Sequence, residues 1–167
     1  MSEVLENLLK HDKDYSESKF KSKVENTFVQ IKLSMVTGRI EKIDHFVNDE
    51  TYEKIKRKVK NDIDNNRIQI YDELNVAEVQ ILSIEEFDDC FKIRVRVLSK
   101  ALDYYIDRNT RKYLSGNNKS RTENYSNMTF TKLKNATEFK VVRKCPSCGA
   151  NIDVNSNRKM QLLSYNF

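Results

Sequence analysis

The spacing of apolar residues changes once along this chain, from a helical period to a strand period, and this change constrains the fold most strongly. Up to Asp64, apolar side chains recur every three or four residues, which is the spacing of one face of an α-helix. From Arg67 they alternate with polar side chains, as in a strand with one buried face. Helices followed by strands predict the α+β class, with N-terminal helices packed on a curved antiparallel sheet.

Four N-terminal segments carry the helical period. A short helical stretch lies within residues 1–14, and a long helix follows, which we expect to have Ser18 as its N-cap and to stop at Gly38. Shorter helices are predicted over Ile40–Val47 and Asp49–Asp64.

The strand period covers much of the rest of the chain. The segments predicted to be extended are, in order, Arg67–Ile84, Phe91–Val97, Ala101–Asp107, Met128–Leu133 and Phe139–Val142. Asp88 and Asp89 predict a turn between the first two, and Asn109–Gly116 predicts another turn. Asn117–Asn124 contains only polar residues and is predicted to be a loop.

The apolar rows of the long helix and of the strand at residues 91–97 are expected to face each other. They form either a packed core or the lining of a ligand pocket, and periodicity alone leaves both open. The residues assigned to this surface are Phe28, Ile31, Phe91, Ile93, Val95 and Phe130. Lys92, Arg94 and Arg96 alternate with the strand's apolar row, so they are expected on the opposite, solvated face.

Charge is distributed unevenly along the chain. Residues 1–107 carry 18 basic and 22 acidic side chains, whereas residues 108–167 carry 12 and 3. A basic final third favours an anionic partner, either nucleic acid, an anionic lipid surface or an acidic protein, unless its lysines are merely solvated. No apolar run is long enough to span a bilayer and no secretory signal is recognisable, so we expect a cytoplasmic protein, with peripheral contact to the inner face of a membrane as one option.

Motifs of catalysis are not found in this sequence. Its three glycines form neither a phosphate-binding loop nor a nucleophile elbow. His11 and His45 are the only histidines, and Asp103 and Asp107 lie in an extended segment where they would not face each other. We therefore predict that the protein is not an enzyme.

Cys145 and Cys148 have the spacing of a zinc knuckle, within the run Cys-Pro-Ser-Cys-Gly. Structural zinc needs four ligands, and this run supplies two. Cys90 is expected to be a small residue near a turn rather than a third ligand. A redox dithiol is the alternative, although no thioredoxin-like βαβ pattern precedes the pair. Zinc is therefore predicted as a cofactor of an incomplete site.

Four pieces of the sequence resemble the Tim44-like domain, which is named for a scaffold subunit of the mitochondrial import motor and has bacterial relatives. They are Asp14-Tyr15-Ser16 with Phe20, the segment Asp49–Tyr52, the run Asp103–Asp107 followed by Thr110 and Gly116, and Tyr125–Lys132. The resemblance covers about residues 14–135. It implies a cone-shaped fold like that of the nuclear-transport-factor-two superfamily, in which a bent sheet wraps a long helix around an apolar pocket. It also implies binding or scaffolding near membranes rather than catalysis.

The same resemblance bears on the C-terminus, because bacterial relatives often append a zinc ribbon that begins Cys-Pro-x-Cys-Gly. Here no second cysteine pair follows, and Met128 stands where such domains tend to have Trp. Met160 is encoded by ATG and Gln161 by CAA or CAG, so the reading frame shifted by one nucleotide must contain TGC, a cysteine codon. With permitted codons for the neighbouring residues, the shifted frame encodes Gly-Lys-Cys-Asn-Tyr-Cys, which resembles the second half of a zinc ribbon. A frameshift therefore predicts that residues 157–167 are an out-of-frame tail packed on nothing; the alternative is a coincidence of codon choice.

The predicted organisation is a helical segment at residues 1–14, a Tim44-like domain at 15–143, half a zinc ribbon at 144–156 and the tail at 157–167. The predicted function is a non-catalytic module that grips a protein or lipid segment in an apolar pocket. The alternative is a nucleic-acid-associated protein that uses its basic final third and cysteine knuckle.

Overall fold

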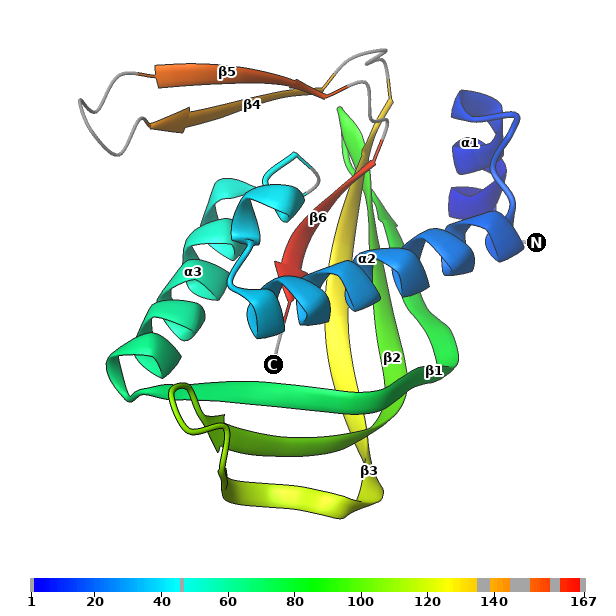
Figure 1. The fold of residues 1–167 in the computed structure, drawn as a ribbon. Coiled ribbons are helices and arrows are strands. Elements are labelled where there is room, and N and C mark those ends of the chain that lie inside the picture. The colour runs from blue at the N-terminus through cyan, green and yellow to red at the C-terminus, as the bar shows by residue number, and fades with distance from the viewer. Residues whose placement is uncertain (1, 46, 135–138, 145–150, 157–159, 166–167) are drawn as a thin grey trace.

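The computed structural model describes residues 2–45, 47–134, 139–144, 151–156 and 160–165, with side chains up to residue 134. The helical elements come first and are α1 (Glu3–His11), α2 (Glu17–Thr37), the short 3-10 helix η1 (Ile40–Ile43) and α3 (Asp49–Asp64). Six strands follow: β1 (Arg67–Glu86), β2 (Cys90–Asp107), β3 (Tyr113–Leu133), β4 (Phe139–Lys144), β5 (Asn151–Ser156) and β6 (Met160–Tyr165). This order confirms the α+β class (Figure 1).

Caps and turns set the helix ends. The Ser16 hydroxyl accepts a hydrogen bond from the Lys19 amide at 3.2 Å, so Ser16, and not the predicted Ser18, is the N-cap of α2. Gly38 ends α2 in the left-handed conformation, at φ 73°, as predicted. The bounds predicted for α3 are confirmed, whereas the predicted helix at Ile40–Val47 ends earlier, at Ile43.

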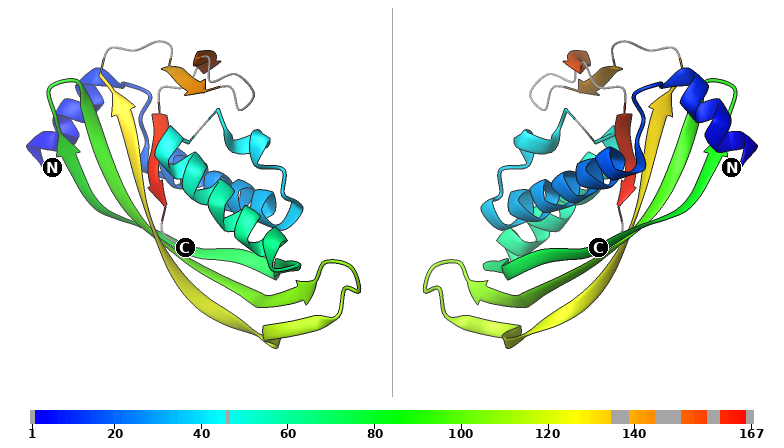
Figure 2. Two further views of the ribbon diagram at one scale, coloured as in Figure 1. Left: turned by 90° about the vertical axis from the view of Figure 1, so that its left-hand side faces the viewer. Right: turned by 90° about the vertical axis from the view of Figure 1, so that its right-hand side faces the viewer.

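The main sheet is antiparallel, with strand order β1-β2-β3-β6. β1 and β2 form a long hairpin whose register shifts between Asp72 and Asn75, and β2 shifts against β3 between Ala101 and Asp103. Glu73 adopts a positive φ of 53° within the first of these shifts. Such irregularities bend strands, and in Figure 2 the sheet curves beneath α2 and α3.

One prediction for the third strand was wrong. Residues Asn117–Asn124, predicted as a loop, belong to β3, where Asn117 pairs with Asp103 and Glu123 pairs with Lys100. Most side chains in this half of β3 are exposed, so backbone pairing with β2 stabilises it rather than burial. The apolar alternation on which the prediction relied is therefore missing from a genuine strand.

The C-terminal segment contradicts a second prediction. β6 (Met160–Tyr165) pairs with β3, with Met128 opposite Tyr165 and Phe130 opposite Leu162. The prediction that residues 157–167 pack on nothing is therefore wrong for β6, because its backbone completes the free edge of β3. β4 and β5 form a separate two-stranded hairpin, which confirms the strand predicted at Phe139–Val142.

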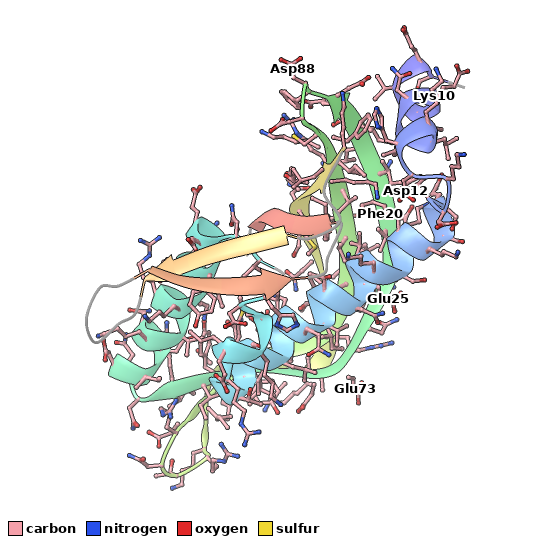
Figure 3. All side chains as sticks on the ribbon, turned by 90° about the horizontal axis from the view of Figure 1, so that it is seen from above. Lys10, Asp12, Phe20, Glu25, Glu73 and Asp88 are labelled. Carbon is pink, nitrogen blue, oxygen red and sulfur yellow. The ribbon has the colours of Figure 1, made fainter. Side chains whose placement is uncertain are left out.

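The core lies between α2 and the concave face of the sheet. Phe20 of α2 packs edge-on against Phe130 of β3, with ring centroids 5.5 Å apart. Figure 3, which views the molecule from above, labels Phe20 in the first turn of α2 and Asp12 at the C-terminal end of α1. Asp12 forms an ion pair with Lys132, whose side chain is 5% exposed, so the junction of α1 and α2 is fixed to β3.

Candidate functional site

The six side chains predicted to line a pocket lie in the packed core. Phe28, Ile31, Phe91, Ile93, Val95 and Phe130 are each 0–1% exposed and belong to one continuous hydrophobic cluster. Of the two arrangements that the sequence left open, the structure therefore favours the core. The cavities that we describe below have other linings.

A largely apolar cavity of about 500 Å³ lies instead between α1, the start of α2 and β1, and we call it the edge groove. Its apolar lining comes from Leu5 and Leu9 of α1, Tyr15 before α2, and Val79, Ile81 and Ile84 of β1. Polar side chains at its margin are Ser16, Glu17, Lys21, Glu78 and Gln80. The groove thus combines an apolar floor with a polar rim, as binding sites commonly do.

The edge groove follows the free side of a strand. Glu78, Val79, Gln80 and Ile81 all line it, although consecutive residues of a strand point to opposite faces. A cavity that touches both faces of four consecutive residues lies along the strand's edge. β1 is the outer strand of the sheet, and none of the described strands pairs with its other side (Figure 1). Its backbone N–H and C=O groups there can pair with an incoming extended chain.

The α1 wall of the groove is held in place by several contacts. Leu8 is fully buried, and Ser2 caps the helix by accepting a hydrogen bond from the Leu5 amide at 3.3 Å. The Asn7 side chain donates to Glu86 at the end of β1, at 2.9 Å. Together with the ion pair of Asp12, these contacts position α1 against the sheet, so the groove is formed before any partner arrives.

The apolar side chains of α1 pack against the rest of the protein or line the edge groove. Leu8 lies in the core, Val4 and Leu5 pack against it, and Leu9 lines the edge groove. None of the helices in the described part of the chain is long and apolar enough to cross a membrane.

Tyr15 lines the edge groove, and the pKa of its hydroxyl is raised. Burial raises its pKa, and the neighbouring carboxylates of Glu17 and Asp12 raise it further. The hydroxyl therefore stays protonated at neutral pH and can donate a hydrogen bond. Glu17 is itself paired with Lys21 at 2.7 Å, so the rim beside Tyr15 carries no net charge from that pair.

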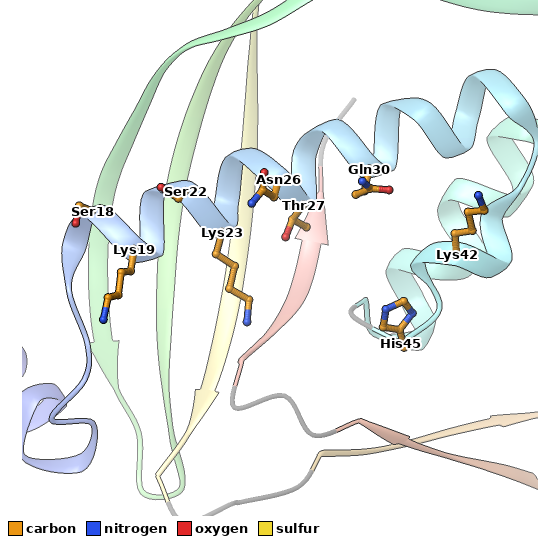
Figure 4. A pocket seen from close by; sticks show the side chains of 9 residues that line it. All are labelled: Ser18, Lys19, Ser22, Lys23, Asn26, Thr27, Gln30, Lys42 and His45. Atoms are coloured by element: carbon orange, nitrogen blue, oxygen red, sulfur yellow. The ribbon is translucent and has the colours of Figure 1, made fainter.

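A second groove, of about 660 Å³, follows α2 and η1, and we call it the lysine groove (Figure 4). Lys19 and Lys23 come from one side of α2, and Lys42 and His45 come from the segment after it. Ser18, Ser22, Asn26, Thr27 and Gln30 complete the lining, so no carboxylate is among its described residues. The lysine groove has the charge and polarity to attract an anion.

The predicted zinc ligands Cys145 and Cys148 lie outside the described residues, between β4 and β5 in the sequence. Within the described ranges, no three histidine, cysteine or acidic side chains are grouped to hold a metal. Cys90 is a buried free thiol at the start of β2, as predicted, and burial raises its pKa. Zinc binding stays a prediction.

Sequence reasoning missed a third, partly open cavity of about 290 Å³ between α2, α3 and the sheet. Lys32 of α2 and Asp103 of β2 both line it, although a lysine on the apolar side of a helix has no signal in the sequence. His11 is exposed and His45 half-buried, as expected. Asp103 and Asp107 have different partners, Gln69 and Asn66, so they form no carboxylate pair.

Comparison with known protein families identifies the fold. The sequence matches the profile of the Tim44-like domain over residues 1–144. The chain belongs to the Tim44-like domain family. A search of curated proteins found no significant match. Tim44-like domains are in general non-catalytic binding domains whose partners are proteins or membranes.

The residues that carry the resemblance have clear positions in this Tim44-like domain. Tyr15 lines the edge groove and Phe20 lies in the core. Asp107 caps the β2–β3 turn, because its carboxylate accepts hydrogen bonds from the amides of Asn109 and Thr110, both at 2.8 Å. These bonds hold the pKa of Asp107 below its usual value.

Gly116 of the same motif is required by close packing. Its φ is 99°, and a Cβ there would lie 2.6 Å from the Asp103 carbonyl oxygen and from the Tyr104 Cα. The family motif at Asp103–Gly116 therefore forms the turn between β2 and β3 and the strand residues beside it. The motif at Asp14-Tyr15-Ser16 contributes Tyr15 to the lining of the edge groove.

Proposed function

We propose that this Tim44-like domain is a non-catalytic binding module that holds an extended segment of a partner protein in the edge groove. The observation that carries the proposal is the position of the groove, an apolar cavity along the unpaired edge of β1. A bound segment would add a strand to β1 through its backbone and insert apolar side chains between α1 and the sheet.

The free strand edge favours a protein segment over a lipid. Backbone N–H and C=O groups along β1 find matching partners in another polypeptide, whereas an acyl chain would leave them facing hydrocarbon. Each apolar side chain of the segment that becomes buried would contribute about 1.5–3 kcal/mol before the cost of ordering is subtracted. Two or three such anchors contribute about 3–9 kcal/mol before those costs are subtracted, so a complex of roughly micromolar affinity, about 8 kcal/mol, also needs the backbone hydrogen bonds to β1.

The test is selection from a random peptide library against the whole chain, followed by affinity measurements with one variant pair. Leu9→Glu places a charge in the groove at a half-buried position of α1. Leu33→Glu is the matched control, because Leu33 also lies on a helix, α2, is 50% exposed and does not line the groove. We expect selected peptides to alternate apolar and polar residues, and to lose at least about tenfold in affinity with Leu9→Glu only.

Two results would contradict this proposal. One is a set of peptides whose binding is equally sensitive to both variants, because the groove would then not be the site. The other is tight binding to vesicles that Leu9→Glu abolishes while no peptide is selected, because the occupant of the groove would then be lipid. The chain's circular dichroism and melting temperature are measured for both variants, so that loss of folding is recognised.

The lysine groove favours a second candidate, contact with a nucleic-acid strand. Lys19, Lys23 and Lys42 surround a cavity with no carboxylate among its described lining residues. If all three neutralise phosphates of a single strand, the slope of log affinity against log salt is about −2. Lys23→Gln should reduce that slope by about 0.7 in fluorescence anisotropy with a single-stranded oligonucleotide. A flat salt dependence would exclude this candidate.

A further inference from the structure

The polar rim of the edge groove carries more negative than positive charge. Two glutamates, Glu17 and Glu78, line it, and Lys21 is the only cation among its described lining residues. The Lys21 ammonium lies 2.7 Å from the Glu17 carboxylate, so these two charges compensate each other. Glu78 is exposed on β1 and forms no ion pair with any residue that the structure describes. An uncompensated carboxylate therefore lies directly on the strand that borders the groove.

Further carboxylates lie beside the groove lining on both helices. Glu6 of α1 is exposed and precedes Leu9 by three residues, so the two side chains are neighbours on the helix surface. α1 as a whole carries two glutamates, one lysine and one histidine. On α2, Glu25 is exposed and follows Lys21 by four residues, so two glutamates flank this single ammonium. The excess of negative charge thus extends beyond Glu78.

The hydroxyl of Tyr15 responds to the electrostatic potential at one end of the groove. Burial raises its pKa, and the carboxylates of Glu17 and Asp12 raise it further, because nearby negative charge disfavours the phenolate anion. Lys19 and Lys23 of α2 line the lysine groove rather than this one. The potential at the Tyr15 end of the edge groove is therefore negative, although the whole chain has a net charge of +5.

We propose that the segment held in the edge groove is basic, with lysine or arginine at the positions that alternate with its apolar residues. This inference rests on the proposed function, because it names the chemistry of the same partner. Successive residues of an added strand point to opposite faces, so apolar side chains can enter between α1 and the sheet while basic ones lie on the outer face. Glu78 is on that outer face, since the next residue, Val79, packs against the core. An acidic segment would meet like charge there.

The experiment compares three versions of one peptide that is selected for binding to the full chain. Their apolar positions are identical, and their polar positions are all lysine, all glutamine or all glutamate. The lysine version should bind about two- to fivefold more tightly than the glutamine version at low salt, and the glutamate version should bind most weakly. The differences should shrink at about 1 M salt, where charges are screened beyond about 3 Å.

The outcomes separate this inference from the proposed function. Equal binding of the three versions, or tightest binding of the glutamate version as the net charge of +5 alone would favour, overturns the inference. If Leu9→Glu still weakens every version in that case, the groove remains the site and only the inference is lost. If no version responds to Leu9→Glu, the inference and the proposed function are both overturned.

Two variants locate the charge that is responsible. Glu78→Lys should lower the affinity of the lysine version by at least about twofold and raise that of the glutamate version, because like charges then face each other in the first case. Glu53→Lys is the matched control, because it makes the same change in net charge at an exposed residue of α3 that does not line the groove. An unchanged preference in Glu78→Lys, or an equal effect of Glu53→Lys, would overturn the assignment to Glu78. The three peptides need no variant, so they test the inference even if either variant fails to fold.

Discussion

Replacing Phe28 by alanine tests the packing of α2 on the sheet. Phe28 is fully buried in the central cluster, together with Ile31 and Val95. Truncating a buried phenylalanine removes its transfer free energy and leaves a cavity, which together cost about 3–5 kcal/mol. The change also removes the contact of the Lys32 ammonium, 5.4 Å from the Phe28 ring centroid. We therefore expect a loss in this range.

Thermal unfolding followed by circular dichroism gives the measurement. For a chain of this size each kcal/mol lowers the melting temperature by about 2–4 °C, so Phe28→Ala should melt roughly 6–20 °C below the wild type. Leu33→Ala is the control, because Leu33 lies on the same helix but is 50% exposed. Its free energy of unfolding should change by no more than about 0.5 kcal/mol.

A fall of less than about 2 °C for Phe28→Ala would refute the reasoning, because a buried ring cannot be removed at so small a cost. An equal fall for Leu33→Ala would also refute it. In that case α2 would be turned about its axis, and the side of the helix that we assign to the core would be wrong.

Three further predictions concern separate features. Gly116→Ala should destabilise the fold by at least about 1 kcal/mol in urea unfolding, because its Cβ would meet the Asp103 carbonyl oxygen at 2.6 Å; a neutral effect would contradict the close approach. The pKa of Lys32, lowered to about 8, means that between about pH 8 and 10.5 the unfolded chain binds more protons, so stability rises with pH there. Relative to Lys32→Met, the wild type should gain on the order of 3 kcal/mol from about pH 7 to about pH 10.5, and a constant difference would contradict the burial of the charge. Elemental analysis should find little zinc, or one ion shared by two chains through Cys145 and Cys148; a full equivalent held tightly by a monomer would contradict the incomplete site.

The helices and the core could be predicted because one periodic signal determines both. The apolar side of α3 runs without interruption from Tyr52 to Val59, and its bounds agree with the structure. The row from Phe91 to Val97 alternates strictly, so its burial followed from the period of two. The resemblance to Tim44-like domains added the bent sheet, which periodicity does not encode.

The binding sites could not be predicted in the same way. The edge groove depends on which strand is outermost and on where α1 docks, and neither leaves a local pattern. Lys32 appears in the sequence as a polar interruption, and it becomes a buried cation because the folded chain packs it against the rings of Phe28 and Tyr71. Residues Asn117–Asn124 form a strand through backbone pairing, so their polar side chains misled the prediction.

Hydrogen exchange at the outer edge of β1 tests the central claim most directly. Amide exchange of Glu78–Ile84 is measured for the full chain alone and with a peptide selected for binding. If the peptide adds a strand in the edge groove, alternate amides of this segment, those that point away from β2, should exchange at least about tenfold more slowly when it is bound. Protection confined to α2 or α3, or unchanged exchange at β1 under saturating peptide, would contradict the claim that this Tim44-like domain binds its partner along that edge.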